Sequence, residues 1–123
     1  MEPNFFEIAK SQITQNDFFV WLLNWANDEN KELDKELNEI AKNFVRFLLG
    51  EKSDFPIKNV QADGQWHDID IIVAVNDEYI IAINDKLSDT YFGTQLMDYK
   101  IQINKHYPNK KAKFIYLITN NDD

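Results

Sequence analysis

Apolar residues recur with helical spacing through the first half of the chain. Over residues 31–49 they follow the i, i+4, i+7 pattern of one helix face, and Gly50 stands where a left-handed residue would end that helix. Residues 14–27 carry a second apolar stripe of the same kind, and residues 5–9 indicate a shorter helix before it. The first half of the chain is therefore predicted to be helical.

The spacing changes to that of strands after Gly50. Residues 57–61 predict a weak strand, whereas residues 69–75 and 79–83 are strong runs rich in β-branched side chains. The polar run Asn76-Asp77-Glu78 between the strong runs is typical of a hairpin turn. Because both strong runs are apolar at nearly every position, we expect central strands that are covered on both faces.

A final helix and strand complete the pattern. Residues 93–106 have apolar positions at helical spacing and end before Pro108, and residues 113–119 form another apolar strand. The order of helices, three strands, helix and strand predicts an α/β fold, an α+β sandwich with a mixed central sheet flanked by helices. No linker interrupts residues 1–123, so we expect one domain, either alone or as a piece of a longer protein.

Composition narrows the class of protein. The 123 residues are 44% hydrophobic, and no apolar run approaches the roughly 20 residues of a membrane span. With no cysteine, the chain has no disulfide, no thiolate nucleophile and no cysteine-ligated metal. The first residues lack the basic and apolar regions of an export signal, so a cytoplasmic location is the simplest expectation, with no membrane partner.

The net charge of −8 is unevenly distributed along the sequence. Residues 64–85 contain five acidic and no basic residues, whereas residues 86–121 contain six lysines and two aspartates. The negative net charge of the chain argues against non-specific binding along nucleic acid. The basic segment, residues 86–121, could still form one surface that faces phosphates. Its candidate nucleic-acid contacts are Lys100, Lys105, Lys110 and Lys111, although such lysines are also common on surfaces that contact only solvent.

The predicted hairpin brings polar side chains to one end of the sheet. A turn centred on Asp77 places Asp70 opposite Asn84, and strand alternation puts both on the same face as Lys86. Burying an acid, an amide oxygen and a lysine at the end of a hairpin costs free energy unless a partner compensates them. A metal ion or a phosphate would be such a partner. The alternative is a plain ion pair between Asp70 and Lys86 near solvent.

Several short motifs surround these residues. They are Asp70, the run Asn84-Asp85-Lys86, the helical run Gln95-Leu96-Met97-Asp98-Tyr99, and the N-terminal run Ser11-Gln12-Ile13-Thr14-Gln15. Together they resemble the PD-(D/E)XK nuclease superfamily, in particular a bacterial branch with an isoleucine-aspartate strand, a Glu-x-Lys strand end and a Gln-Leu-x-x-Tyr helix. The resemblance covers most of the chain and implies a restriction-endonuclease-like core.

This resemblance implies a metal-dependent phosphodiesterase that cleaves DNA, or else RNA, with Mg²⁺ or Mn²⁺. Asp70 matches the first metal-binding carboxylate, and Asp85 matches a position that offers its backbone carbonyl to the ion. Lys86 matches the lysine that orients the attacking water, while Gln95 and Tyr99 match an auxiliary pair. Cutting both strands of a duplex would require a homodimer.

Two positions depart from the superfamily pattern. Asn84 stands where an acidic metal ligand is expected, and Gln12 stands where this branch often has a glutamate. An amide still offers a carbonyl oxygen but no charge, so metal binding should be weaker and the chain inactive or crippled. Either natural decay or deliberate inactivation would explain the amides. The alternative function is a non-catalytic nuclease-fold module that binds a protein or nucleic-acid partner, for example in phage defence.

Other candidates are weaker. His67 and His106 have no mutual spacing that suggests a zinc site, so a structural or surface role is favoured. The aromatic residues Phe18, Trp21 and Trp25 lie on a predicted amphipathic helix and are expected in the core rather than on a base-stacking platform.

Overall fold

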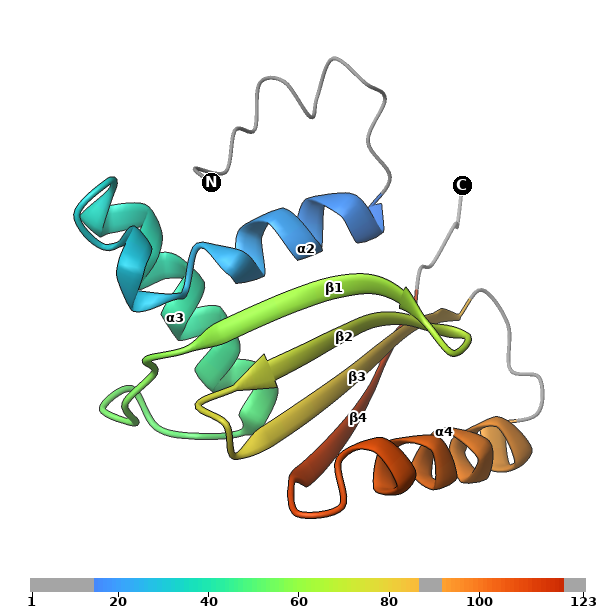
Figure 1. The fold of residues 1–123 in the computed structure, drawn as a ribbon. Coiled ribbons are helices and arrows are strands. Elements are labelled where there is room, and N and C mark those ends of the chain that lie inside the picture. The colour runs from blue at the N-terminus through green and yellow to red at the C-terminus, as the bar shows by residue number, and fades with distance from the viewer. Residues whose placement is uncertain (1–14, 87–91, 119–123) are drawn as a thin grey trace.

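The structure is a computed structural model that describes residues 15–86 and 92–118. Its elements in chain order are α2 (Gln15–Asn24), the 3-10 helix η1 (Asp28–Asn30), α3 (Lys35–Leu49), β1 (Val60–Trp66), β2 (Ile69–Val75), β3 (Tyr79–Lys86), α4 (Phe92–His106) and β4 (Lys111–Ile118). A mixed four-stranded sheet with flanking helices confirms the predicted α+β class (Figure 1). The short helix predicted over residues 5–9 lies outside the described residues.

The four strands lie side by side in chain order. β1, β2 and β3 are joined as antiparallel neighbours, and β4 runs parallel to β3 after the crossover through α4. Val75 pairs with Tyr79 and Val73 with Ile81, so the predicted hairpin register is confirmed. Asn76 and Asp77, the first two of the three residues between the closing pair Val75 and Tyr79, adopt φ values of 54° and 56°, a left-handed conformation that Asn and Asp tolerate better than most residues.

Each face of the sheet has its own hydrophobic core. α2 and α3 cover one face, where side chains such as Leu23, Val45 and Val73 are fully buried. α4 covers the opposite face and packs Tyr99 and Ile103 against the other side of the sheet (Figure 1). Burial from both sides explains why β2 and β3 are apolar along nearly their whole length, as predicted.

Local capping sets the ends of α3. The side chain of Asp34 accepts a hydrogen bond from the N–H of Leu37 at 3.0 Å, and this cap starts the helix at Lys35 rather than at the predicted Lys31. At the other end Gly50 has φ 73°, and its N–H donates to the carbonyls of Arg46 and Phe47 in the last turn. The predicted helix end is therefore confirmed.

The first strand begins later than predicted. The backbone N–H groups of Lys58 and Asn59 donate to the side-chain oxygen of Asn76, at 2.8 and 3.2 Å, instead of entering a ladder. The strand therefore runs over Val60–Trp66, not over residues 57–61. Its second half is mostly polar and exposed, so the alternation of apolar residues could not reveal it.

Candidate functional site

Asp70 and Asn84 meet at one end of the β2–β3 hairpin. The backbone N–H of Asp70 donates a hydrogen bond to Oδ1 of Asn84 at 2.6 Å. Asn84 is only 5% exposed, whereas Asp70 is half-buried. The structure thus brings together the two residues that the hairpin register predicts to lie opposite each other, and Asp70 is not sealed inside the core.

Tyr99 ties α4 to this pair of residues. Its hydroxyl donates to the backbone carbonyl of Asp68 at 3.2 Å, and the residue is 7% exposed. Burial raises the pKa of Tyr99 above its ordinary value, and a side-chain hydrogen bond with Asn84 partly offsets this rise. The negative charges of Asp70 and Asp68 raise the pKa further. Tyr99 is therefore a neutral phenol near neutral pH, and it anchors the side chain of Asn84 from the helix.

The remaining predicted site residues are located by the backbone alone, or lie outside the described part of the chain. Asp85 and Lys86 are the last two residues of β3 and pair with Leu117 and Ile118 of β4. Lys86 occupies a position on the same strand face as Asn84. Gln95 lies in the first half of α4, one turn before Tyr99. Gln12 lies outside the described residues.

A polar pocket lies beside this cluster. It has a volume of about 590 Å³ and is lined by His67, Asp68, Asp98, Tyr99, Ile101 and Gln102. Tyr99 belongs both to the pocket wall and to the hydrogen-bonded cluster with Asn84. Among the described residues, this lining includes two acids, Asp68 and Asp98, and no lysine or arginine.

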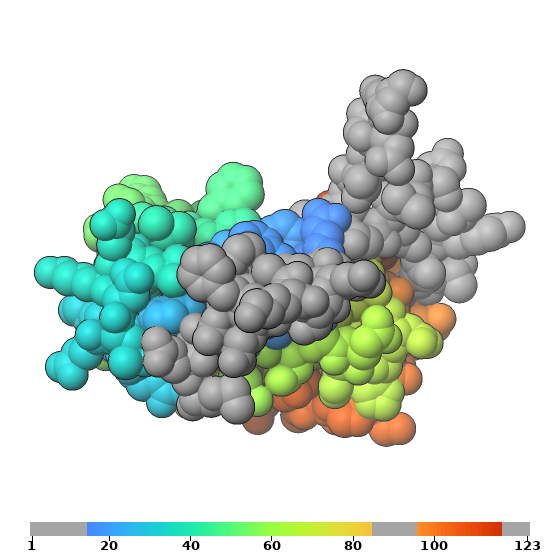
Figure 2. Space-filling model, turned by 90° about the horizontal axis from the view of Figure 1, so that it is seen from above, coloured from blue at the N-terminus to red at the C-terminus, as the bar shows by residue number. Residues whose placement is uncertain are grey.

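The turn between β1 and β2 contributes His67 and Asp68 to the wall of the pocket. His67 and Asp68, the two residues between the paired Trp66 and Ile69, have φ values of 47° and 67°, the left-handed pair that a two-residue hairpin turn requires, and Gln65 of β1 has φ 53°. In the space-filling view this turn lies against α4 (Figure 2).

Aromatic packing holds this turn against α4. The ring centroids of Trp66 and His67 are 4.5 Å apart, and those of His67 and His106 are 4.9 Å apart. Nothing in the spacing of His67 and His106 along the sequence predicts that their rings lie side by side. Among the residues described, no three His, Cys, Asp or Glu side chains gather as a metal site, so the histidine pair lacks a third ligand of this kind.

The predicted nucleic-acid lysines do not form one group. Lys100 and Lys105 are exposed on α4, whereas Lys110 donates to the carbonyl of Asp77 and Lys111 pairs with Glu78. Lys111 lies beside Tyr79 at the start of β3, while Asn84 lies about 17 Å farther along that strand. Lys110 and Lys111 therefore border the far end of the sheet, and a nucleic-acid role for these lysines stays a prediction.

The Asp70–Asn84 cluster offers hard oxygen donors for a divalent cation. Asp70 supplies a carboxylate, and the carbonyl oxygen of Asn84 has a second lone pair beyond the one that accepts the Asp70 N–H. Such oxygens suit Mg²⁺ or Mn²⁺, but one carboxylate gives little charge. These residues fit a weak cation site, which an acid at position 84 would strengthen.

Comparisons with protein families, with curated proteins and with solved structures find no match for this chain. Within the described part of the chain, no helix combines the length and apolar character that crossing a membrane requires.

Proposed function

We propose that this chain is a nuclease-like domain of the restriction-endonuclease type, with its site at Asp70 and Asn84, and that the amide at position 84 leaves it inactive or crippled. The observation that carries the proposal is the hydrogen bond from the Asp70 N–H to Asn84, because it joins the two motif positions at the end of one hairpin. The chain order of three antiparallel strands, a crossover helix and a parallel strand also agrees with the resemblance in sequence.

In this proposal the substrate is DNA, with RNA as the alternative nucleic acid, and the compartment is the cytoplasm. Asp70, the oxygen of Asn84 and the main-chain carbonyl of Asp85 would hold Mg²⁺ or Mn²⁺. The bound ion would neutralise phosphate charge and lower the pKa of its water. Lys86 would orient that water or the phosphate, and Gln95 would support the site beside Tyr99. Tyr99 fixes the side chain of Asn84 from α4.

A second function, a non-catalytic module that binds a partner, is favoured by one specific observation. Asn84 is held on two sides, since its oxygen accepts the Asp70 N–H and its side chain also bonds Tyr99. A buried amide satisfied in this way stabilises the hairpin without any ion. The same residues would then be structural remnants of a nuclease site.

Restoring the acid at position 84 tests the proposal. We expect Asn84→Glu or Asn84→Asp to nick supercoiled plasmid with Mg²⁺ or Mn²⁺, and the unchanged chain to be at least about 100-fold slower because it lacks one ligand charge. The matched control is Asp70→Asn in the Asn84→Glu background, which should abolish nicking. If both acid variants fold and neither cuts plasmid or single-stranded RNA, the enzymatic proposal is wrong.

A further inference from the structure

We infer that the outer edge of β4 accepts an extended, acidic segment of a partner protein as an added strand. This inference is independent of the nuclease proposal. It concerns the outer edge of β4 rather than the hairpin end with Asp70 and Asn84, and a different kind of ligand. It rests on the contrast between the two edges of the sheet, on a hollow beside β4, and on the local charge.

At the other edge of the sheet, side chains of α2 and of the turn after it close the first half of β1. Nδ2 of Asn24 donates to the carbonyl of Ala62 at 3.0 Å, and Oδ1 of Asn24 accepts the N–H of Ala62 at 2.9 Å. Asn27 donates to the carbonyl of Val60 at 2.9 Å. At Val60 and Ala62 these two amides make the hydrogen bonds that a neighbouring strand would make, so the first half of β1 cannot readily take another strand.

The β4 edge has no such closure within residues 15–86 and 92–118. The N–H of Lys111 donates to the carbonyl of Glu78 at 2.9 Å. In a parallel pair every second residue turns its backbone N–H and C=O to the partner strand, so Lys111 and alternate residues after it form the hydrogen bonds with β3. Ala112 and Phe114 therefore direct their backbone N–H and C=O groups outward. An exposed row of this kind is a template for β-strand addition.

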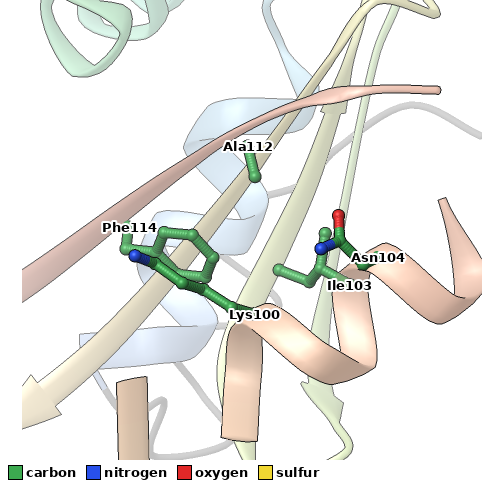
Figure 3. A pocket seen from close by; sticks show the side chains of 5 residues that line it. All are labelled: Lys100, Ile103, Asn104, Ala112 and Phe114. Carbon is green, nitrogen blue, oxygen red and sulfur yellow. The ribbon is translucent and has the colours of Figure 1, made fainter. Parts of the chain in front are cut away.

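A hollow for a side chain lies next to these outward groups. Lys100, Ile103 and Asn104 of α4 and Ala112 and Phe114 of β4 line it, as Figure 3 shows. Its volume is about 230 Å³. A cavity of about 150 Å³ can hold benzene, so this hollow has room for one leucine or phenylalanine side chain. In strand addition, backbone bonds give affinity and such hollows select the alternate side chains.

Charge decides which partner fits the edge. Residues 99–118 contain five lysines and no acid, although the whole chain carries −8; Lys111 pairs with Glu78, whereas Lys100, Lys105 and Lys113 are exposed. Two copies of this chain paired through β4 would bring like charges together, which disfavours self-association. A partner strand rich in Asp and Glu would instead meet complementary charge, with Lys113 and Lys100 both exposed near the edge.

Peptide binding to the whole chain tests this inference. The probes are fluorescent peptides of about eight residues, a typical strand length, in which Glu or Asp alternates with Thr or Val and one central residue is Leu, Phe or Tyr. We expect at least one to bind and to change fluorescence polarisation, with binding that weakens as salt increases. No binding by any of these peptides would overturn the inference.

Two variants of one residue locate the peptide. Ala112→Pro removes an outward N–H that β3 does not use, so the fold should persist while peptide binding falls at least about tenfold. Ala112→Leu fills part of the hollow and leaves the backbone unchanged, and it should also weaken binding.

Ala112→Ser is the control and should bind normally. Circular dichroism and thermal melting check that each variant is folded, and binding that is unchanged in Ala112→Pro and Ala112→Leu would contradict the inference.

Two other occupants of the edge give different results. A dimer seen by sedimentation and lost in Ala112→Pro would assign the edge to a second copy of the chain. Binding of a single-stranded DNA oligonucleotide that displaces the peptide and tolerates Ala112→Pro would assign the lysines to nucleic acid. Either result would overturn the acidic-partner inference.

Discussion

At the scale of single residues, the candidate site depends on how Asn84 is satisfied. A residue that is 5% exposed must find partners for its amide, and it finds them in the N–H of Asp70 and the side chain of Tyr99. This arrangement makes the metal-free hairpin stable. It also means that any acid introduced at position 84 will lack the amide donor that now faces Tyr99.

The nearest isostere of Asn84 should therefore reveal whether the site prefers a cation. Without added metal, Asn84→Asp should lower the free energy of unfolding by about 1–3 kcal/mol, because a buried carboxylate would lie beside Asp70. Adding Mg²⁺ should restore most of this loss, which thermal melting with and without the ion can measure. The unchanged chain is the control, and its melting temperature should respond little. A variant that Mg²⁺ does not stabilise would contradict a cation site.

Tyr99 makes a prediction about alkaline pH. Its pKa in the folded protein is raised above 10.0, chiefly by burial, so the folded state holds the phenol proton more tightly than the unfolded state does. The associated stability is complete below pH 10 and is lost as pH rises through the raised pKa. Tyr99→Phe should cost about 1 kcal/mol at pH 8 through the lost hydroxyl bonds. Its stability should then decline less steeply above pH 10.

Urea denaturation at pH 8 and at alkaline pH measures both effects. Some alkaline decline should persist in the variant, since burial also raises the pKa of Tyr116. Equal slopes for the unchanged chain and the variant above pH 10 would contradict the role given to Tyr99.

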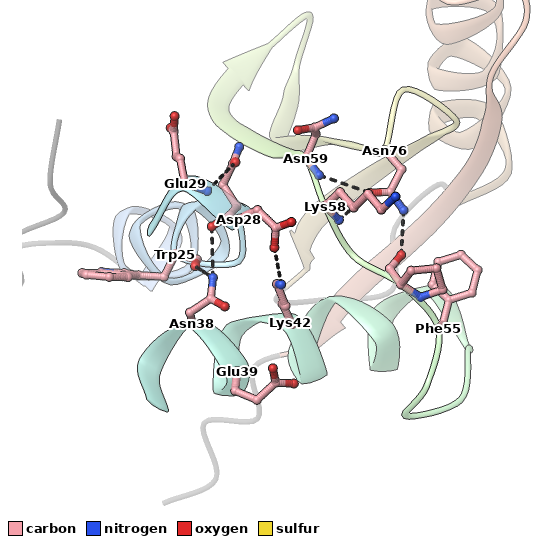
Figure 4. A network of polar contacts seen from close by, with 12 residues as sticks. Trp25, Asp28, Glu29, Asn38, Glu39, Lys42, Phe55, Lys58, Asn59 and Asn76 are labelled. Atoms are coloured by element: carbon pink, nitrogen blue, oxygen red, sulfur yellow. Dashed lines mark hydrogen bonds and ion pairs between the residues drawn. The ribbon is translucent and has the colours of Figure 1, made fainter. Parts of the chain in front are cut away.

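At the scale of elements, side-chain amides and one ion pair fasten α3 to the segment after α2. Nδ2 of Asn38, which is 1% exposed, donates to the carbonyls of Trp25 and Asn27 at 2.8 and 3.0 Å (Figure 4). Lys42 forms an ion pair with Asp28 in the same network. Two carbonyls of the segment after α2 thus find a donor on a neighbouring helix rather than in water.

Asn38→Ala should be strongly destabilising for this reason. It leaves two partly or fully buried carbonyls without their donor, and we expect a loss of about 2 kcal/mol in the free energy of unfolding. Chemical denaturation followed by circular dichroism gives this value. Glu36→Ala, at an exposed position of the same helix, is the control and should change stability by less than about 0.5 kcal/mol. Similar values for the two variants would show that the amide does not fasten the helices.

At the scale of the whole molecule, the two ends and the two edges of the sheet differ in chemistry. The end with Asp70 and Asn84 is acidic and lies beside a polar pocket, whereas the start of β4 is rich in lysine. Asparagine side chains close the first half of the β1 edge, and the described part of the chain leaves the β4 edge open. The two segments of opposite charge nevertheless meet at the start of β4, where Lys111 pairs with Glu78 and Lys110 bonds the carbonyl of Asp77.

Local chemistry alone determined much of this arrangement. Period-2 and period-3.6 patterns predicted the elements, and the Asn76-Asp77 turn fixed the hairpin register that brings Asp70 to Asn84. Contacts between residues close in sequence are governed by local backbone preferences, so the sequence shows them directly. The β1 boundaries were wrong because the side chain of Asn76, far along the chain, bonds the backbone before that strand.

Only the tertiary structure decided which distant groups meet. Tyr99 reaches Asp68 and Asn84, His67 stacks near His106, and Asn24 closes the edge at Ala62. The spacing of these residues along the sequence does not predict their contacts, because each contact depends on where a helix crosses the sheet. That crossing is set by the packing of two separate cores, a property of the whole chain that no single segment encodes.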